Sequence, residues 1–367
     1  MAKLFEHTQL KDLRLANRFI RSATWEGLAD DNGGCTPELA DRMVELARGR
    51  VGLIITGHSY VHPAGQATPR QLGVDKDEHV DGLSKMTEVV HREGGRIVMQ
   101  LAHGGLKAEP KLTNPTPLGP STGEGLVAPP GKEMTAADIQ QVVTAFGQAA
   151  QRAKTAGFDG VQIHAAHGYL LSQFLSPAFN QRGDEYGGTL ENRVRIILEV
   201  LRSIRQAVGR NYPILIKINS EDFLENGLSP ENFLEAAVIL ANAGIDAIEV
   251  SGGTLLSGRF VPFRKEITFD RDQAYFRRAA RRLKKMSNIP VILIGGIRSY
   301  LLAERLVAEG VTDYIALSRP LIREPMLIKR WQSGDLRKAT CISCNGCFGP
   351  ARSGRGILCV QDIKWKS

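Results

Sequence analysis

Short runs rich in β-branched residues recur along the chain, and most are followed by a stretch of helical periodicity. We predict strands over 18–23, 51–56, 96–101, 159–164, 214–219, 246–250, 291–294 and 314–317. The predicted helices are 37–47, 80–93, 136–156, 190–208, 230–243 and 274–286. Strands that alternate with helices favour a parallel sheet with helical crossovers. Eight such units in about 320 residues suit an α/β fold of the closed (β/α)8 TIM-barrel type better than an open doubly wound sheet.

Three helix ends share one short phrase, in which a glycine is followed by an apolar residue and then an acid, with a threonine before the acid in the third copy. The three copies are Gly157-Phe-Asp159, Gly244-Ile-Asp246 and Gly310-Val-Thr-Asp313. Glycine commonly ends a helix in the left-handed conformation, so each phrase predicts a helix end directly before a strand.

The composition is that of a globular protein, with 43% hydrophobic and 23% charged residues. We expect one barrel over residues 1–335 and a cysteine-rich extension over 336–367 packed on it. The first residues are charged throughout, and no apolar run approaches the roughly 18 residues that span a bilayer. We therefore expect a cytoplasmic protein without a membrane partner.

The formal net charge is +8, and the densest basic cluster falls between Arg277 and Lys285. The cluster follows an amphipathic helical pattern, which is typical of a solvated helix face. We therefore expect no nucleic-acid partner.

Two long connections, 103–133 and 165–189, follow predicted strands, and in a barrel that places them on the catalytic face.

The segment H-A-A-H-G-Y, at the end of the fourth predicted strand, contains His164, His167 and Tyr169. Three interpretations are open. The histidines could be a buried structural pair or a metal pair, although no third ligand has an obvious spacing. They could also donate hydrogen bonds to a carbonyl or nitro oxygen, with the phenol placed to deliver a proton.

Several motifs together resemble the Old Yellow Enzyme family of NAD(P)H:flavin oxidoreductases. They include L-A-N-R-F-I-R-S-A-T (15–24), H-A-A-H-G-Y-L-L-S-Q-F-L-S-P (164–177) and N-Q-R-x-D-x-Y-G-G-x-x-x-N-R (180–193). The resemblance implies an FMN-binding ene-reductase that uses NAD(P)H to reduce activated C=C bonds of enones or related small molecules. The alternative within the family is a dehydrogenase that runs the reverse reaction or an amine oxidation. A non-redox, phosphate-binding barrel that uses Lys217 is the alternative from another class.

The family resemblance assigns roles to the main polar residues. His164 and His167 would hold the oxygen of the substrate, and Tyr169 would supply the proton. Gln100 would bind the pyrimidine edge of the flavin. Lys217, inside the apolar run I-L-I-K-I-N, must face a polar site or a counter-charge, and the family places a cation there beside flavin N1.

The remaining expected contacts lie at other strand ends. Gly295, Gly296, Ser318 and Arg319 occupy the loops after strands seven and eight, where barrel enzymes commonly bind phosphate. Further cofactor contacts are expected at Ser22, Ala23, Thr24, Gly57 and Gly253. Trp25 is either a substrate contact or part of the packing at the top of the barrel. Arg264 is either a substrate contact or a surface charge.

Four cysteines, Cys341, Cys344, Cys347 and Cys359, have the spacing C-x2-C-x2-C-x11-C. This spacing suits a [4Fe–4S] cluster, with zinc or free thiols as alternatives. It resembles the branch of the family that contains 2,4-dienoyl-CoA reductase and trimethylamine dehydrogenase. No G-x-G-x-x-G unit accompanies it, so we expect either a separate electron donor or direct reduction by NAD(P)H. We also expect a homo-oligomer.

Overall fold

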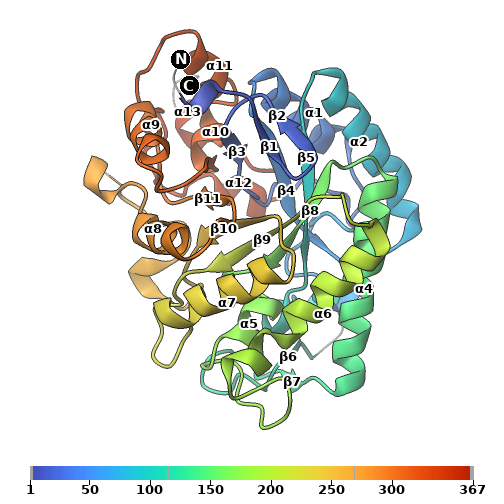
Figure 1. Ribbon diagram of the computed structural model, residues 1–367. Helices are drawn as coiled ribbons and strands as arrows, with labels where there is room; N and C mark the ends of the chain where they lie inside the picture. The colour runs from blue at the N-terminus through green and yellow to red at the C-terminus, as the bar shows by residue number, and fades with distance from the viewer. Residues whose placement is uncertain (1–2, 114–115, 268, 364–367) are drawn as a thin grey trace.

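Eight parallel strands close into a barrel in the computed structural model, which describes residues 3–113, 116–267 and 269–363 (Figure 1). The order around the barrel is β10-β11-β12-β3-β4-β5-β8-β9. The strands are β3 (Phe19–Arg21), β4 (Leu53–Tyr60), β5 (Ile97–Ala102), β8 (Gly160–Ala165), β9 (Ile214–Asn219), β10 (Ala247–Ser251), β11 (Val291–Leu293) and β12 (Tyr314–Leu317). The prediction of a (β/α)8 barrel is confirmed, and each predicted strand overlaps an observed one.

Helices surround the barrel on its outer face (Figure 1). Those predicted from the sequence are α1 (Pro37–Arg48), α2 (Val80–Arg92), α4 (Ala136–Thr155), α6 (Leu190–Val208), α7 (Pro230–Asn242) and α8 (Arg277–Met286). Those not predicted are α3 (Pro110–Thr113), α5 (Leu170–Leu175), α9 (Tyr300–Ala308), α10 (Arg319–Arg323), α11 (Leu327–Gln332), α12 (Phe348–Arg352) and α13 (Val360–Ile363). Helix α8 begins three residues later than expected, because Ala274 adopts a positive φ of 53° that a helix does not allow.

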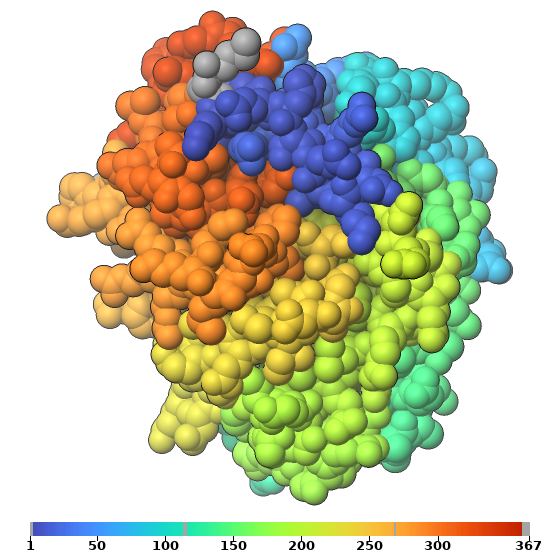
Figure 2. All heavy atoms as spheres, viewed as in Figure 1, coloured from blue at the N-terminus to red at the C-terminus, as the bar shows by residue number. Residues whose placement is uncertain are grey.

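A short hairpin, β1 (Thr8–Leu10) and β2 (Leu13–Leu15), was not predicted. Its leucines Leu10, Leu13 and Leu15 are buried in one apolar cluster with interior side chains of the barrel such as Ile20 and Leu215. The N-terminal segment lies beside the C-terminal third of the chain on the face seen in Figure 2. The hairpin therefore fills the end of the barrel opposite the predicted site.

The repeated glycine–acid phrase has the same structure in all three places. Gly157, Gly244 and Gly310 have φ values of 83°, 99° and 67°, as the predicted helix ends require. The three acids that follow accept a backbone N–H from the first residue of the preceding barrel strand. The pairs are Asp159 with Ile97 at 2.8 Å, Asp246 with Ile214 at 2.9 Å and Asp313 with Val291 at 2.7 Å. In these three places the acid therefore links the start of one barrel strand to the start of the preceding strand by a hydrogen bond.

The basic face of α8 is paired with acids of neighbouring elements. Arg281 lies 3.2 Å from Glu309, Arg282 lies 3.2 Å from Glu231, and Lys284 lies 3.0 Å from Asp313. These ion pairs fit the interpretation of a solvated helix face. Among the described helices, none has both the length and the apolar character needed to cross a bilayer.

The segment after α11 returns to the loop that follows β3. Cys347, Ala351 and Ile357 are buried in a small cluster against Trp25 and Ile322. The Ile357 N–H donates to the Glu26 carbonyl oxygen at 2.7 Å. Arg70 donates to the Gly354 carbonyl oxygen. The cysteine-bearing segment therefore contacts the face of the barrel where the strands end.

The glycine–acid phrase leads to a test of stability. Replacement of Asp246 by Ala removes the acceptor for the Ile214 N–H and the partner of Arg205 at 2.8 Å. We expect the free energy of unfolding to fall by about 2 kcal/mol, measured by urea denaturation. The control is Glu309→Ala, which breaks only an exposed ion pair and should change stability by less than about 0.5 kcal/mol. Equal losses in both variants would contradict the proposed role.

Candidate active site

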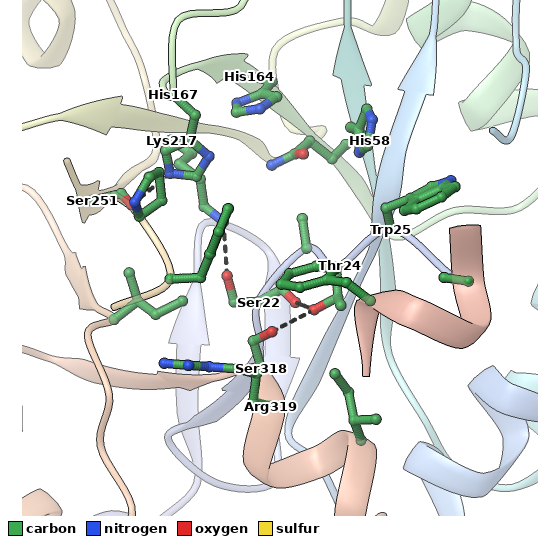
Figure 3. A pocket seen from close by; sticks show the side chains of 18 of the residues that line it. Ser22, Thr24, Trp25, His58, His164, His167, Lys217, Ser251, Ser318 and Arg319 are labelled. Carbon is green, nitrogen blue, oxygen red and sulfur yellow. Dashed lines mark hydrogen bonds between the residues drawn. The ribbon is translucent and has the colours of Figure 1, made fainter. Parts of the chain in front are cut away.

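A cavity of 510 Å³ opens where the barrel strands end at their carboxyl termini. Its lining brings together most of the predicted site residues from distant parts of the sequence (Figure 3). These are Ser22, Ala23, Thr24, Trp25, Gln100, His164, His167, Tyr169, Lys217, Gly296, Ser318 and Arg319. The position of the cavity matches the catalytic face expected of a barrel enzyme.

The two histidines and the tyrosine after β8 lie against one another. The ring centroid of His164 lies 5.3 Å from the ring centroid of His167 and 4.5 Å from that of Tyr169. His167 has a positive φ of 63°, and its N–H donates to Asn219 Oδ1 at 3.0 Å. The left-handed turn at His167, which glycine continues at position 168, lets all three side chains face the same cavity.

Burial keeps both imidazoles neutral at ordinary pH. It lowers the pKa of His164 well below the usual value, and nearby His167 and Lys217 lower it further. The pKa of His167 is lowered in the same way, first by burial and then by Lys217 and Lys107. His167 Nε2 lies 2.7 Å from Ser251 Oγ, whereas His164 Nδ1 is buried without a partner among the described residues. A neutral imidazole has one N–H donor, so the pair can bind an oxygen atom of a ligand.

Tyr169 has a partner that the sequence reasoning missed. Its hydroxyl oxygen lies 3.2 Å from Nε2 of His58, which belongs to β4 and also lines the cavity. Burial raises the pKa of Tyr169, so the phenol keeps its proton, and burial lowers the pKa of His58 to about 4. A polar residue near the end of a buried strand was the available signal for His58.

Lys107 is a second missed residue, on the 3₁₀ helix η4 (Gly105–Lys107) in the long connection after β5. Its ammonium donates to the His167 carbonyl oxygen and lies 5.4 Å from the ring centroid of Tyr169. Burial lowers the pKa of Lys107 to about 8, although the nearby Asp222 opposes the shift. The long connection therefore contributes a cation to the cavity wall.

Lys217 faces both a polar cavity and a counter-charge, the two surroundings expected for a lysine in an apolar strand. It lines the cavity and forms an ion pair at 3.1 Å with Glu249, with side chains 3% and 0% exposed. Its ammonium also donates to Ser22 Oγ at 2.7 Å (Figure 3). Burial lowers the pKa of Lys217, and the Glu249 carboxylate opposes that shift. Glu249 was not predicted, because an acid in the run A-I-E-V-S gives no sign of its partner.

Two arginines lie at the end of the cavity formed by the loops after β11 and β12. Arg319 donates to Asn345 Oδ1 at 2.6 Å and to the Arg264 carbonyl oxygen at 2.9 Å. Arg298, which was not predicted, lines the cavity and donates to the Cys341 carbonyl oxygen at 2.7 Å. Ser318 Oγ is 2.8 Å from Thr24 Oγ1. Two guanidinium groups beside Gly296 form a suitable environment for a phosphate.

Four of the predicted cofactor and substrate residues do not line the cavity. A Cβ at Gly57 would meet the Glu26 carboxylate and the Thr24 carbonyl oxygen, so the space beside Gly57 is already filled by protein. A Cβ at Gly253 would meet the Phe260 carbonyl oxygen. At Gly295, where φ is 134°, it would meet Tyr275. Close packing between loops therefore requires glycine at these three positions, none of which lines the cavity.

Arg264 is the fourth residue outside the cavity lining. Its guanidinium carbon lies 4.3 Å from the ring centroid of Tyr275, 5.1 Å from that of Phe260 and 5.3 Å from that of Phe223. Such contacts are favourable cation–π interactions. Arg264 therefore holds the loop after β10 together, a role that neither the substrate-contact nor the surface-charge interpretation anticipated.

The four tail cysteines have free thiols, of which Cys341 and Cys347 are buried and Cys344 is exposed. Burial and, to a smaller extent, the neighbouring Cys341 raise the pKa of Cys347 to about 11. The Cys344 sulfur accepts the Gly346 N–H at 3.4 Å. In the described part of the chain, no three His, Cys, Asp or Glu side chains are arranged to hold a metal ion.

Comparisons with known proteins agree with the fold. The profile of the NADH:flavin oxidoreductase / NADH oxidase family matches residues 3–337. An NADH oxidase of Thermoanaerobacter brockii is 38% identical over 94% of this chain, which spans 53% of that protein. The chain thus covers about half the length of this relative.

Two solved structures have the same barrel. A 2-naphthoyl-CoA reductase in complex with 2-naphthoyl-CoA has a TM-score of 0.90 at 28% identity, covering 97% of this chain and 56% of that one. The Old Yellow Enzyme homologue from Zymomonas mobilis has a TM-score of 0.78 at 25% identity, covering 93% of this chain and 95% of that one.

The buried histidines predict how stability depends on pH. The pKa of His58 is about 4 in the folded chain and near 6.5 when exposed, so its stabilising effect is complete above about pH 6.5 and is lost as the pH falls towards 4. Between pH 7 and pH 5 the free energy of unfolding should fall by about 2 kcal/mol more in the wild type than in His58→Gln, measured by urea denaturation. Ser59→Ala, a neighbouring buried change without a titrating group, should keep the wild-type dependence. The same pH dependence in His58→Gln as in the wild type would refute this assignment.

Proposed function

Because the chain belongs to the NADH:flavin oxidoreductase / NADH oxidase family, we propose that it is an FMN-dependent ene-reductase. Its substrates would be activated C=C bonds of enones or related electron-poor molecules. The observation that carries the proposal is the grouping of two neutral imidazoles and a protonated phenol in the cavity that Lys217 lines. Family membership is incompatible with the alternative of a non-redox barrel.

The cavity has the donor set that FMN requires. Lys217 supplies a cation for the flavin N1 region, and Gln100 supplies an amide for the pyrimidine edge. Arg319 and Arg298 supply guanidinium groups for the phosphate, beside Gly296 and Ser318. Ser22, Ala23 and Thr24 would lie along the ring. When bound, FMN supplies hydride transfer, from NAD(P)H to the flavin and from flavin N5 to the substrate.

The histidines would bind and polarise the substrate. A neutral N–H from each of His164 and His167 would bind the carbonyl oxygen, and the unpartnered His164 Nδ1 supports a ligand at this place. Trp25 would line the same space. Hydrogen bonds to that oxygen stabilise the negative charge that develops on it during reduction.

Tyr169 would supply the proton. Its pKa is raised by burial, so it holds a proton on its hydroxyl oxygen at neutral pH. His58 Nε2, at 3.2 Å, is placed to accept a hydrogen bond from the phenol and so to orient its hydroxyl group. The same groups, used in the opposite direction, would serve the dehydrogenase alternative or an amine oxidation.

The cysteines support a second, separate proposal. Cys341, Cys344, Cys347 and Cys359 would bind a [4Fe–4S] cluster, as their spacing suggests. The thiols also influence one another, since Cys359 raises the pKa of Cys341 and Cys341 raises the pKa of Cys347. The described thiols do not form a ready metal site, so cluster binding would have to reorient them. A separate electron donor could pass electrons to such a cluster. In the alternative, NAD(P)H would reduce the flavin directly. The barrel with its tail (336–367) would assemble as a homo-oligomer.

The proton donor can be tested by half-reactions. In Tyr169→Phe we expect reoxidation of the reduced enzyme by 2-cyclohexen-1-one to slow about 10²–10⁴-fold, because the alkene carbon loses its proton source. Reduction of the enzyme by NADPH or NADH should keep its wild-type rate in stopped-flow measurements. Tyr60→Phe, a buried tyrosine outside the cavity lining that binds the Asn32 carbonyl oxygen, is the control. Equal slowing of both half-reactions would rule out the proton-donor role.

The cluster can be tested by metal analysis. Protein purified without oxygen should contain iron and acid-labile sulfide in equal amounts, about four of each per chain. Cys347→Ala should lose most of both, whereas Cys35→Ala should not, because Cys35 lies outside the tail. Zinc in place of iron, or no metal at all, would contradict the cluster proposal and leave the flavin proposal intact.

A further inference from the structure

A continuous chain of polar side chains crosses the barrel interior beneath the cavity. It begins with Glu249 on β10 and passes through Gln162 on β8 to Gln100 on β5. Glu249 and Gln162 are completely buried and do not line the cavity, whereas Gln100 does. The chain therefore connects a buried charge to the surface that a ligand would touch.

Glu249 accepts hydrogen bonds on both of its carboxylate oxygens. Lys217 Nζ lies 3.1 Å from Oε1 and donates to Ser22 Oγ at 2.7 Å. The Ser22 hydroxyl, having accepted from Lys217, donates to Glu249 Oε1 at 2.6 Å. Gln162 Nε2 donates to Oε2 at 2.8 Å. A carboxylate that faces an ammonium, a hydroxyl and an amide N–H can only accept, so the direction of each bond is fixed.

The donor and acceptor roles fixed at Glu249 also fix the orientation of the two glutamine amides. Since the nitrogen of Gln162 faces Glu249, its Oε1 faces Gln100 and accepts from Gln100 Nε2 at 2.7 Å. The Gln100 nitrogen is thus held on the side of Gln162. Its Oε1 is left without a hydrogen-bond partner among the described residues, on a side chain that lines the cavity.

We propose that Glu249 is a positioning residue that sets the polarity of the Gln162–Gln100 relay, so that the cavity presents a hydrogen-bond acceptor to an N–H group of its ligand. This inference rests on the proposed FMN function, in which the imide N3–H of the flavin is the matching donor. The second hydrogen on Gln100 Nε2 remains free to donate to a neighbouring carbonyl oxygen. An imide edge, which carries an N–H between two carbonyl groups, is the ligand chemistry that such an amide selects.

A carboxylate is necessary for this effect. An amide at position 249 would keep its oxygen toward the donor Lys217, so its NH₂ group would face Gln162 and could donate to it. Both glutamines could then rotate by half a turn and still keep the hydrogen bond between them. Gln100 would present its NH₂ group to the cavity as readily as its oxygen, and the preference for an N–H donor would be lost.

The test reconstitutes the full chain with ¹⁵N-labelled FMN and follows the flavin N3–H by NMR. In the wild type we expect a downfield N3–H proton that exchanges slowly with solvent. In Glu249→Gln and in Gln162→Leu it should move upfield and exchange faster, and the FMN Kd should rise up to about tenfold, the value of one hydrogen bond. Gln162→Leu keeps the Lys217–Glu249 ion pair, so it tests the relay even if Glu249→Gln does not fold.

Glu26→Gln is the matched control. Glu26 is also a buried carboxylate paired with a buried cation, Arg21 at 2.5 Å, and neither residue lines the cavity. It should leave the N3–H resonance unchanged. An unchanged N3–H in the folded relay variants would overturn the proposal, as would an equal change in Glu26→Gln. Failure of the wild type to bind FMN would instead refute the proposed function.

Discussion

The buried ion pair between Lys217 and Glu249 is the interaction on which the floor of the active site depends. The two residues are paired in register on the neighbouring strands β9 and β10, so their side chains enter the barrel interior side by side. Removing one partner of such a pair typically costs about 3–5 kcal/mol, because it leaves an uncompensated charge away from water. Ser22, Gln162 and, through Gln162, Gln100 take their hydrogen-bond directions from this pair.

Burial has opposite consequences for the acids and bases around the cavity. It disfavours the charged form of every group, which lowers the pKa of His58, His164 and His167 and raises that of Tyr169. The result is a set of neutral donors beside a cationic floor. One physical cause, burial, therefore keeps both the two imidazoles and the phenol neutral.

The cysteine-bearing segment forms part of the cavity wall. Ser343, Phe348 and Ala351 line the cavity. Arg319 joins the two regions, because its guanidinium lines the cavity and donates to the Asn345 side chain and to the Ser343 carbonyl oxygen. Changes in this segment, including the binding of a metal, would therefore be felt at the cavity wall next to Trp25.

The sequence by itself determined the barrel and the centre of its site, because those signals are local. Strand and helix periodicity and the phrases ending at Asp159, Asp246 and Asp313 depend only on neighbours in the chain. His164, His167 and Tyr169 came together in the structure because they share one strand end. Only the tertiary structure placed His58, Lys107, Arg298 and Glu249, since each meets its partner through long-range packing. It also decided that Gly57 accommodates Glu26, because a glycine in a sequence does not show which atoms will approach it.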